Sequence, residues 1–332
     1  MTKIIRWGMV GCGDVTEVKS GPGFYKARNS MLYGVTNRTY EKAVDYAKRH
    51  GVEKVYSNID EMIADGKVDV IYIATPPGSH KEYALKCAEA KIPCYIEKPV
   101  AINYYEHMEI MQAFEKTDTK AFAAYYRRGH RRFRKVKELL ETGAIGDIRF
   151  VHLSLYRPVS ENEKQNQSWR VKPEISGGGI FMDVGVHQLD ILDFLIGRIS
   201  DVKSFSANYG GFYEPEDTIN AAFVFENGVQ MTADWCFVAG FRKDEIEIVG
   251  SLGRITLSCF ENDPIVVEVE NGKRRFIFDD LEHVQQPLIQ TIVDELNEQD
   301  ICPSTLKTAL NTAWVCEKIY HCNAAQKKKE ER

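Results

Sequence analysis

The chain has 332 residues, 44% of them hydrophobic and 27% charged, and a formal net charge of −5. This composition is typical of an ordinary globular protein that is long enough for two domains. The mild negative charge argues against a general binder of nucleic acid, and no run approaches the ~18 apolar residues of a membrane span. The one basic run, 127–135, is better explained as the start of an amphipathic helix.

The eight cysteines are scattered along the chain and form no C-x-x-C pair. Several, such as Cys94 and Cys236, lie within apolar patterns, as expected of reduced thiols in a core. The N-terminus passes directly into an apolar segment and a glycine turn, without the pattern of a signal peptide. We therefore expect a cytoplasmic protein with no membrane partner.

The first third of the chain alternates short apolar runs with segments of helical periodicity. Strands are predicted at 4–10, 31–36, 68–75, 93–97 and 121–126, and helices at 39–51 and 78–91. Alternation of strand and helix with nearly continuous apolar strands is typical of a parallel, doubly wound sheet.

The pattern changes after about residue 147. Long strands are predicted at 148–156, 202–210, 218–237, 244–258 and 264–278, and helices at about 187–197, 284–298 and 304–324. Turns of the Asn-Gly type join several of these strands, which indicates hairpins and a large, open, mostly antiparallel sheet. We expect an α/β protein with a first domain over 1–123 and a second, α+β domain over 124–332, whose last helix is able to pack back on the first.

A glycine turn follows the first predicted strand. Gly11 and Gly13 permit a sharp turn and the close approach of a pyrophosphate, and Asp14 and Val15 open the helix beyond it. At this place in an α/β alternation the turn predicts a dinucleotide-binding (Rossmann) site. The third glycine of the usual motif is Thr16 here, so somewhat looser packing of helix on strand is expected.

The end of the second strand carries Asn37 and Arg38, where an acidic residue normally binds the ribose of NAD. A neutral Asn does not repel a 2′-phosphate, and a guanidinium offers it a bidentate partner. We therefore expect NADP(H) to be preferred over NAD(H). The alternative is that Arg38 stacks on the adenine of NAD.

Two later loops are expected at the carboxyl edge of the same sheet, where ligands of such folds bind. The first contains Thr75, Pro76 and His80, and the second, after the strand that includes Ile96, contains Glu97 and Lys98. All five are predicted to contact the cofactor, and Glu97 is alternatively expected to orient the loop or its neighbours. Lys98 is expected beside its nicotinamide end.

Further along, Asp183 and His187 are four residues apart, which on a helix would place them on one face, although Gly185 makes the helix start uncertain. Together with a lysine, these groups would suffice for proton transfer to a developing alkoxide. The alternatives are a helix-capping Asp, a core His, or a metal site that also includes Asp190.

Five segments, taken together, resemble the glucose–fructose oxidoreductase and inositol 2-dehydrogenase (Gfo/Idh/MocA) family. They are GMVGCGDV, ATPPGSH, EKP, LLETGAIGDI and GGGIFMDVGVHQLDILDFLIG, in the family's order and over nearly the whole chain. The resemblance implies a dinucleotide domain followed by an open α/β sheet, and catalytic roles for Lys98, Asp183 and His187.

Trp169 and Arg170 resemble the family's Trp-Arg segment before the triple glycine and are expected to contact the substrate or the cofactor. Tyr125 and Arg127 are further candidate substrate contacts, the alternative being that they form part of an exposed rim. One departure is Ala124, where many family members have Asn before an aromatic residue, so one polar contact is expected to be lost or replaced.

The function expected on these grounds is an NADP(H)-dependent oxidoreductase acting on a hydroxyl or carbonyl of a sugar, anhydro-sugar, polyol or cyclitol. Lys98 or His187 would protonate the substrate oxygen, and Asp183 would position the group that does so. The alternatives are an enzyme that recycles a tightly held NAD(P), as oxidoreductase or glycosidase, or an inert cofactor-binding sensor. The broad sheet face of the second half predicts a homodimer or a tetramer.

Overall fold

The computed structural model describes residues 2–330, with side chains as far as residue 320. The chain forms two compact units, one containing the residues up to His130 with Leu281–Leu310, the other Arg131–Asp280 with the chain from Asn311 onward. The first unit thus extends beyond the boundary predicted at residue 123 and includes a returning segment. The physical reason is that Leu288, Ile289 and Ile292 of this segment are buried in the first unit's core.

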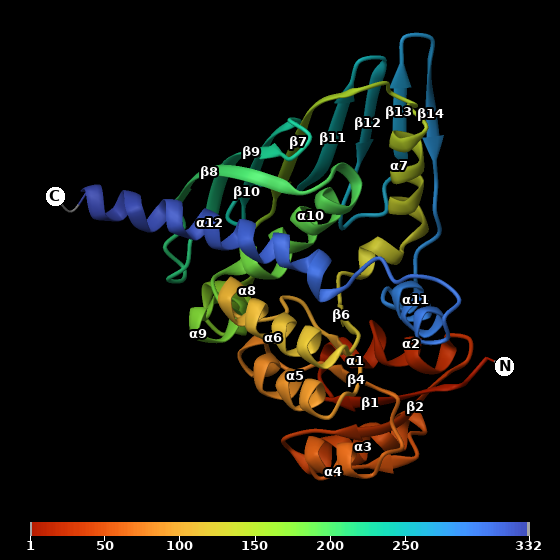
Figure 1. The fold of residues 1–332 in the computed structure, drawn as a ribbon. Coiled ribbons are helices and arrows are strands. Elements are labelled where there is room, and N and C mark those ends of the chain that lie inside the picture. Colours follow the sequence, from red (N-terminus) through yellow and green to blue (C-terminus); the bar gives the residue numbers. More distant parts are fainter. Residues whose placement is uncertain (1, 331–332) are drawn as a thin grey trace. The chain divides into compact units, whose positions relative to one another are not determined.

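The first unit is built on a six-stranded sheet with the order β3-β2-β1-β4-β5-β6, in which all neighbours are parallel (Figure 1). The strands are β1 (Ile5–Val10), β2 (Ser30–Thr36), β3 (Lys54–Val55), β4 (Val70–Ile73), β5 (Cys94–Ile96) and β6 (Ala121–Ala123). The helices are α1 (Asp14–Val18), α2 (Gly21–Lys26), α3 (Tyr40–His50), α4 (Ile59–Ala64), α5 (His80–Glu89), α6 (Tyr104–Thr117) and α11 (Gln286–Leu296). The predicted doubly wound parallel sheet is confirmed.

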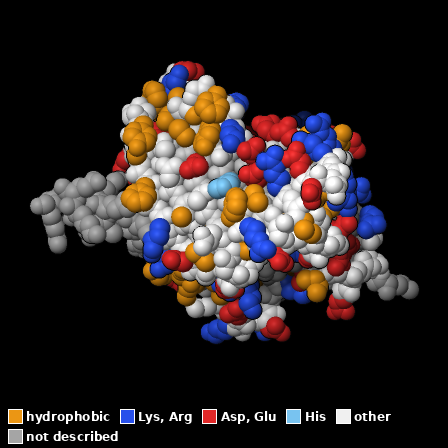
Figure 2. Space-filling view, turned by 90° about the horizontal axis from the view of Figure 1, so that it is seen from above, with side chains coloured by type: hydrophobic (Ala, Val, Ile, Leu, Met, Phe, Trp, Pro, Cys, Tyr) orange, Lys and Arg blue, Asp and Glu red, His pale blue; other side chains and the backbone are white. Residues whose placement is uncertain are grey.

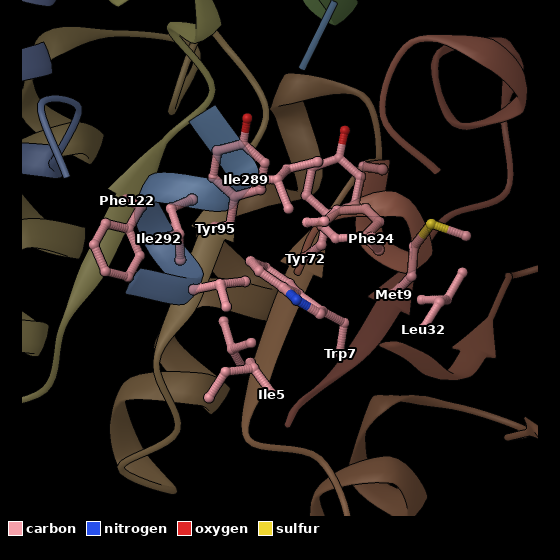
Figure 3. Packing of buried hydrophobic residues seen from close by; sticks show 14 of the residues in the cluster. Ile5, Trp7, Met9, Phe24, Leu32, Tyr72, Tyr95, Phe122, Ile289 and Ile292 are labelled. Carbon is pink, nitrogen blue, oxygen red and sulfur yellow. The ribbon is translucent and has the colours of Figure 1, made fainter. Parts of the chain in front are cut away.

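Large aromatic side chains fill the core of this unit (Figure 3). The ring centroids of Trp7 and Phe24 are 4.5 Å apart, and those of Tyr72 and Tyr95 are 5.1 Å apart. Because residues on both faces of β4 and β5 are buried, these strands are apolar throughout rather than alternating. The tyrosines differ from the other rings in carrying hydroxyl groups that must find polar partners.

The second unit is built on an eight-stranded sheet with the order β14-β13-β12-β11-β7-β10-β9-β8, antiparallel except for the β7–β10 pair. The strands are β7 (Ile148–Tyr156), β8 (Ile199–Ala207), β9 (Thr218–Phe225), β10 (Gln230–Cys236), β11 (Lys243–Gly250), β12 (Gly253–Leu257), β13 (Ile265–Val269) and β14 (Gly272–Phe276). The helices are α7 (Arg131–Glu141), α8 (Glu161–Lys164), α9 (Pro173–Ser176), α10 (Ile180–Ile196) and α12 (Leu306–Glu330), the last of which begins in the first unit. The predicted mostly antiparallel sheet, with its hairpins, is confirmed.

One face of the second sheet is covered by helices. Trp235 of β10 donates from its indole N–H to Gln188 of α10 at 2.7 Å, and Ser204 of β8 donates to the carbonyl of Ile319 in α12 at 3.1 Å. Because successive side chains along each strand point to opposite faces, every second residue lies on the other face. That face is more exposed, as at Phe150 and Val224. Figure 2 shows the molecule from above, with hydrophobic patches among charged side chains.

Helix α10 begins earlier than the predicted 187–197, at Ile180, and so includes Asp183. Gly185, which made its start uncertain, has a packing role within the helix. A Cβ at this position would lie 2.3 Å from the ring of Phe181, so only glycine leaves room for the ring. Among the described residues, no helix has the length and hydrophobicity that a membrane span requires.

Candidate cofactor and catalytic site

The glycine turn between β1 and α1 has the geometry of a nucleotide cradle. Gly11 has φ of +102°, and a Cβ there would lie 2.7 Å from the carbonyl oxygen of Ala74. At Gly13, by contrast, a Cβ would meet nothing within 4 Å. The first glycine is therefore required by the fold of the turn, whereas the second leaves open space at the start of α1. These features fit the pyrophosphate of a dinucleotide.

Thr16 replaces the third glycine of the usual motif without leaving the helix loosely packed. Its side chain is fully buried and donates to the carbonyl of Gly13 at 2.7 Å, and its own carbonyl accepts from Tyr46 at 2.9 Å. The Thr16 hydroxyl thus finds its hydrogen-bond acceptor within the turn.

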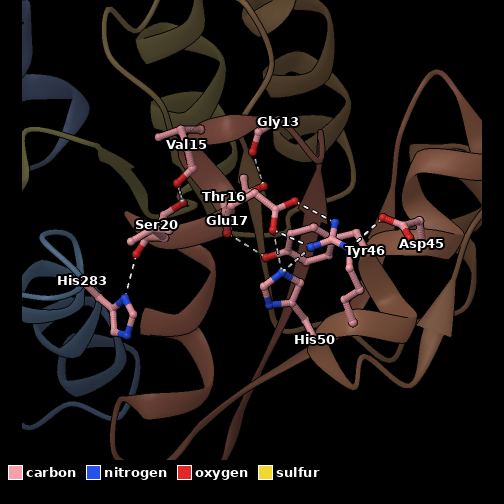
Figure 4. A network of polar contacts seen from close by, with 11 residues as sticks. Gly13, Val15, Thr16, Glu17, Ser20, Asp45, Tyr46, His50 and His283 are labelled. Atoms are coloured by element: carbon pink, nitrogen blue, oxygen red, sulfur yellow. Dashed lines mark hydrogen bonds and ion pairs between the residues drawn. The ribbon is translucent and has the colours of Figure 1, made fainter.

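A polar network ties α1 to α3 beside this turn (Figure 4). Glu17 accepts two bonds from Arg49, at 2.7 and 2.8 Å, and its carboxylate lies 2.9 Å from the ring of His50. These contacts, chiefly the bonds from Arg49, lower the pKa of Glu17 to about 2. Asp45 accepts from the same guanidinium at 2.7 Å. The network therefore fixes the helix that follows the glycine turn against α3.

Asn37 and Arg38 lie just beyond the end of β2. The side-chain oxygen of Asn37 accepts from the backbone N–H of Thr39 at 2.9 Å, and Arg38 is exposed. The amide is therefore held in a local turn, and the position carries no negative charge.

The loop after β4 is joined to the loop after β5 by His80. Its Nδ1 lies 3.0 Å from the carbonyl oxygen of Pro99, and its Nε2 lies 2.7 Å from that of Thr75. The ring has no exposed surface, and burial is the main cause that lowers its pKa. The predicted direct contact of His80 with the cofactor does not fit this burial. The side chain instead fixes the two loops that border the site.

Glu97 and Lys98 follow β5 directly, and the Lys98–Pro99 peptide bond is cis. Glu97 is 7% exposed and faces inward, where its carboxylate accepts from Tyr72, Gln285 and the backbone N–H of Lys98. It therefore orients the loop, and its direct contact with the cofactor stays a prediction. Lys98 is half-buried at the carboxyl edge of the sheet.

In the second unit, α10 places Asp183 and His187 one turn apart on the same side of the helix. Asp183 lies in the first turn, where the helix dipole favours a negative charge. It forms an ion pair with Arg170 at 2.5 Å, and the Arg170 guanidinium lies 4.8 Å from the ring of Trp169. The structure thus brings the predicted Trp169–Arg170 segment together with Asp183, which was predicted separately from it.

His187 is buried, and its ring packs edge-to-face with Phe260 at a centroid distance of 6.1 Å. Phe260 is in turn held through its backbone N–H, which donates to Asp244 at 2.5 Å. The ring orientation of His187 is therefore determined by a neighbour as well as by the helix.

Tyr125 and Arg127, the other predicted substrate contacts, are both buried. The Arg127 guanidinium lies 4.8 Å from the ring centroid of Tyr126, which gives it a cation–π contact within its own turn.

The sequence reasoning missed Tyr72 and Gln285, the two side chains that bond to Glu97. Tyr72 lies in a predicted strand, where an aromatic residue indicates only a core position. Gln285 is 188 residues from Glu97 in the chain, and nothing in the local pattern marks it. The one available signal for both was the presence of a carboxylate at a buried strand end, which needs donors.

Two family models match the chain. The model for the oxidoreductase family with an NAD-binding Rossmann fold covers residues 5–125, and that for the GFO/IDH/MocA C-terminal domain covers 133–256. The chain belongs to the Gfo/Idh/MocA family. The chain is also 35% identical to "Oxidoreductase P35" of Formosa agariphila over 93% of its own length and 96% of that protein.

More distant relatives agree with this family. Myo-inositol 2-dehydrogenase of Thermotoga maritima is 24% identical, over 87% of this chain and 86% of the relative. Among solved structures, levoglucosan dehydrogenase in complex with NADH and levoglucosan has a TM-score of 0.85 at 20% identity and covers 97% of both chains. An oxidoreductase of Agrobacterium radiobacter with NAD+, L-tartaric acid and magnesium has the same TM-score at 21% identity, also over 97% of both chains.

Membership of the Gfo/Idh/MocA family confirms the prediction of an NAD(P)-dependent dehydrogenase or reductase. The residues of the glycine turn fit the cofactor of this family, as the open space at Gly13 indicates. In the described part of the chain, no group of three or more His, Cys, Asp or Glu side chains is arranged to hold a metal ion.

Proposed function

We propose that this Gfo/Idh/MocA protein is an NADP(H)-dependent oxidoreductase that interconverts a hydroxyl and a carbonyl group on a sugar, anhydro-sugar, polyol or cyclitol. The observation that carries the proposal is the place of Lys98 at the carboxyl edge of an NAD-binding Rossmann sheet, where its backbone N–H donates to the buried carboxylate of Glu97. A rigid element there keeps an ammonium group where ligands of such sheets bind.

In this proposal three side chains handle the proton. Lys98 donates a hydrogen bond to the substrate oxygen, and Lys98 or His187 transfers the proton to or from it. Asp183, through its charge, positions the group that transfers the proton. The cofactor, when bound, supplies or accepts the hydride.

The proposed substrate class is supported by the named activities of relatives. These include myo-inositol 2-dehydrogenase, 1,5-anhydro-D-fructose reductase of Ensifer adhaerens, which is 24% identical over 75% of this chain, and levoglucosan dehydrogenase. Trp169 and Arg170 beside Asp183, with Tyr125 and Arg127 in the first unit, are the proposed substrate contacts. An aromatic ring and a guanidinium suit the C–H face and the hydroxyls of a sugar.

The proposed preference for NADP(H) is supported by Asn37 and the exposed Arg38 at the end of β2. The deciding experiment is a fluorescence titration of the purified protein with NADPH and NADH, repeated with the variant Arg38→Leu. Lys42→Leu, which removes a positive charge from an exposed position on α3, serves as the charge-matched control.

We expect tighter binding of NADPH, with at least about a tenfold loss for Arg38→Leu and little change in NADH binding. Equal or tighter binding of NADH by the unaltered protein would refute the preference, and binding of neither cofactor would refute the proposed activity.

We further propose that the outer face of the second sheet binds a second copy of the chain. It presents Phe150, Val224 and Phe205, with 39%, 37% and 67% of their surfaces exposed, on three strands of one sheet. An exposed apolar face of this kind is suited to an isologous dimer. Light scattering is expected to give a dimer or tetramer, and Phe150→Lys to shift it toward monomer. A monomeric unaltered protein at micromolar concentration would refute this.

A cytoplasmic location is also proposed. Seven cysteines within residues 2–320 are free thiols, and five of them are buried, which suits a reducing compartment. Fractionation of the native host, with antibody detection of the chain, tests this.

A further inference from the structure

We propose that Gln285 is a positioning residue for Lys98, acting through Glu97 from a segment 188 residues further along the chain. The inference rests on the proposed function, because it takes Lys98 to be the proton-handling group. It extends the site to residues outside the five segments that carry the family resemblance.

The carboxylate of Glu97 is the centre of the arrangement. One oxygen accepts from the hydroxyl of Tyr72 and from the side-chain amide of Gln285, both at 2.5 Å. The other oxygen accepts from the backbone N–H of Lys98 at 3.2 Å. A buried carboxylate needs such donors to remain charged, and bonds to a charged acceptor are stronger than neutral ones. The first oxygen thus anchors Glu97, and the second positions Lys98.

The orientation of the Gln285 side-chain amide follows from the hydrogen bond that its oxygen accepts. The hydroxyl of Tyr95 donates to the side-chain oxygen of Gln285 at 2.8 Å, so the amide nitrogen must point toward Glu97. Figure 3 shows the hydroxyls of Tyr72 and Tyr95 directed to the same side of the aromatic core. Burial, together with the charge of Glu97, raises the pKa of both phenols well above its usual value, so both remain donors.

Gln285 is itself held in place from two sides. Its backbone N–H donates to the carbonyl of Lys19 at 3.0 Å, and the ring of nearby His283 lies 2.7 Å from the carbonyl of Val18 (Figure 4). The side chain is 1% exposed. The connection between α1 and α2, next to the glycine turn, therefore holds the residue that supports the Lys98 loop.

This arrangement gives Gln285 a role that differs from a purely structural one. A structural glutamine would affect the folded population and leave the remaining active molecules unchanged. A positioning residue affects turnover, because a displaced proton donor lowers the rate in every folded molecule. The two roles are separated by kcat, KM and local backbone protection.

The experiment compares Gln285→Leu with Gln286→Leu, a matched control on the next residue, whose side-chain amide lies 3.5 Å from the carbonyl of Lys26. Tyr72→Phe removes the second donor to the same oxygen of Glu97 and replaces the main variant if that one does not fold. Turnover is measured with NADPH or NADP+ on the best substrate of a panel that includes myo-inositol, levoglucosan and 1,5-anhydro-D-fructose. Hydrogen exchange of the peptide spanning 95–101 is followed separately.

We expect Gln285→Leu and Tyr72→Phe to lower kcat about 10- to 100-fold, with KM and NADPH affinity changed less than about threefold. The exchange of the Lys98 amide should accelerate in both, whereas Gln286→Leu should match the unaltered protein. Unchanged kcat and exchange in both variants would overturn the proposal. So would a loss that is confined to stability or to NADPH binding.

Lys98→Met, measured beside them, separates the two proposals. If Lys98→Met keeps its turnover, the proposed catalytic role of Lys98 fails, and the positioning of a catalytic Lys98 by Gln285 fails with it. If Lys98→Met is inactive while the Gln285 and Tyr72 variants behave like the unaltered protein, only the positioning role fails.

Discussion

Lys98 in the first unit and Asp183 in the second are held by contacts of different accessibility. The loop of Lys98 is supported by Glu97, which is buried and bonded to Tyr72 and Gln285. Asp183 is paired with Arg170, whose side chain is 41% exposed. A buried network has few alternative arrangements, whereas an exposed ion pair competes with water and is weak. From this comparison we expect the loop of Lys98 to keep one position and the carboxylate of Asp183 to have more freedom to adjust.

The first unit also buries other titratable groups, such as His80 and His107, both almost without exposed surface. A histidine buried in this way is kept neutral by the cost of burying its charge, which links the unit's stability to pH.

The largest expected effect is that of Lys98→Met. Loss of the ammonium should lower kcat about 10³-fold while NADPH affinity stays within about threefold, since the group acts on the substrate oxygen. Steady-state kinetics and fluorescence titration check this, with Lys86→Met on α5 as the control, because Lys86 pairs with Asp60 away from the loop. Turnover close to that of the unaltered protein would remove Lys98 from the mechanism.

His107 tests whether a buried histidine of the first unit makes the stability of the protein depend on pH. Its Nε2 lies 3.0 Å from the carbonyl of Leu306, and burial lowers its pKa from 6.5 to about 4. Between these two pH values the unfolded chain binds a proton that the folded chain does not, so stability falls as the pH drops through this range. The loss amounts to about 3 kcal/mol at most.

The variant His107→Gln keeps a donor for Leu306 but does not titrate. Urea unfolding midpoints at pH 7 and pH 4.5 should fall less between the two conditions in this variant than in the unaltered protein. An equal fall in both proteins would show that His107 is not the group responsible.

His187→Ala should lower kcat about 10²-fold, because one of the two proposed proton carriers is lost. Glu141→Ala is the control in the same unit, since the Glu141 side chain is exposed on α7 and lies 3.7 Å from Lys137. If the two variants have the same turnover, His187 is a core histidine and not a catalytic one.

The smallest effect is expected from Arg170→Ala. An ion pair this exposed contributes less than about 1 kcal/mol to stability, so thermal unfolding should change little. Turnover should fall by less than about tenfold, because Asp183 keeps its place in the first turn of α10. A fall in kcat as large as that of His187→Ala would show that Asp183 depends on Arg170 for its position, which would contradict the contrast between the two units.

Much of this molecule was predictable from local pattern. The parallel sheet followed from the alternation of apolar runs and helical segments, and the hairpins of the second sheet from turns such as Asn227-Gly228. The short elements β3 and α4 were not predicted, because two and six residues carry too little periodicity. The start of α10 was placed too late because Gly185 is a poor helix former in isolation, and its contact with Phe181 is not visible in the sequence.

By itself, the sequence determined the fold class, the glycine turn, and the placing of Lys98 at the end of a strand, since periodicity and turn chemistry act over a few residues. It also determined the spacing of Asp183 and His187. Only the tertiary structure decided that Glu97 and His80 face inward, that Arg170 pairs with Asp183, and that Gln285 completes the support of the Lys98 loop. These features depend on which distant segments meet, and burial then imposes a partner on every polar group that the meeting encloses.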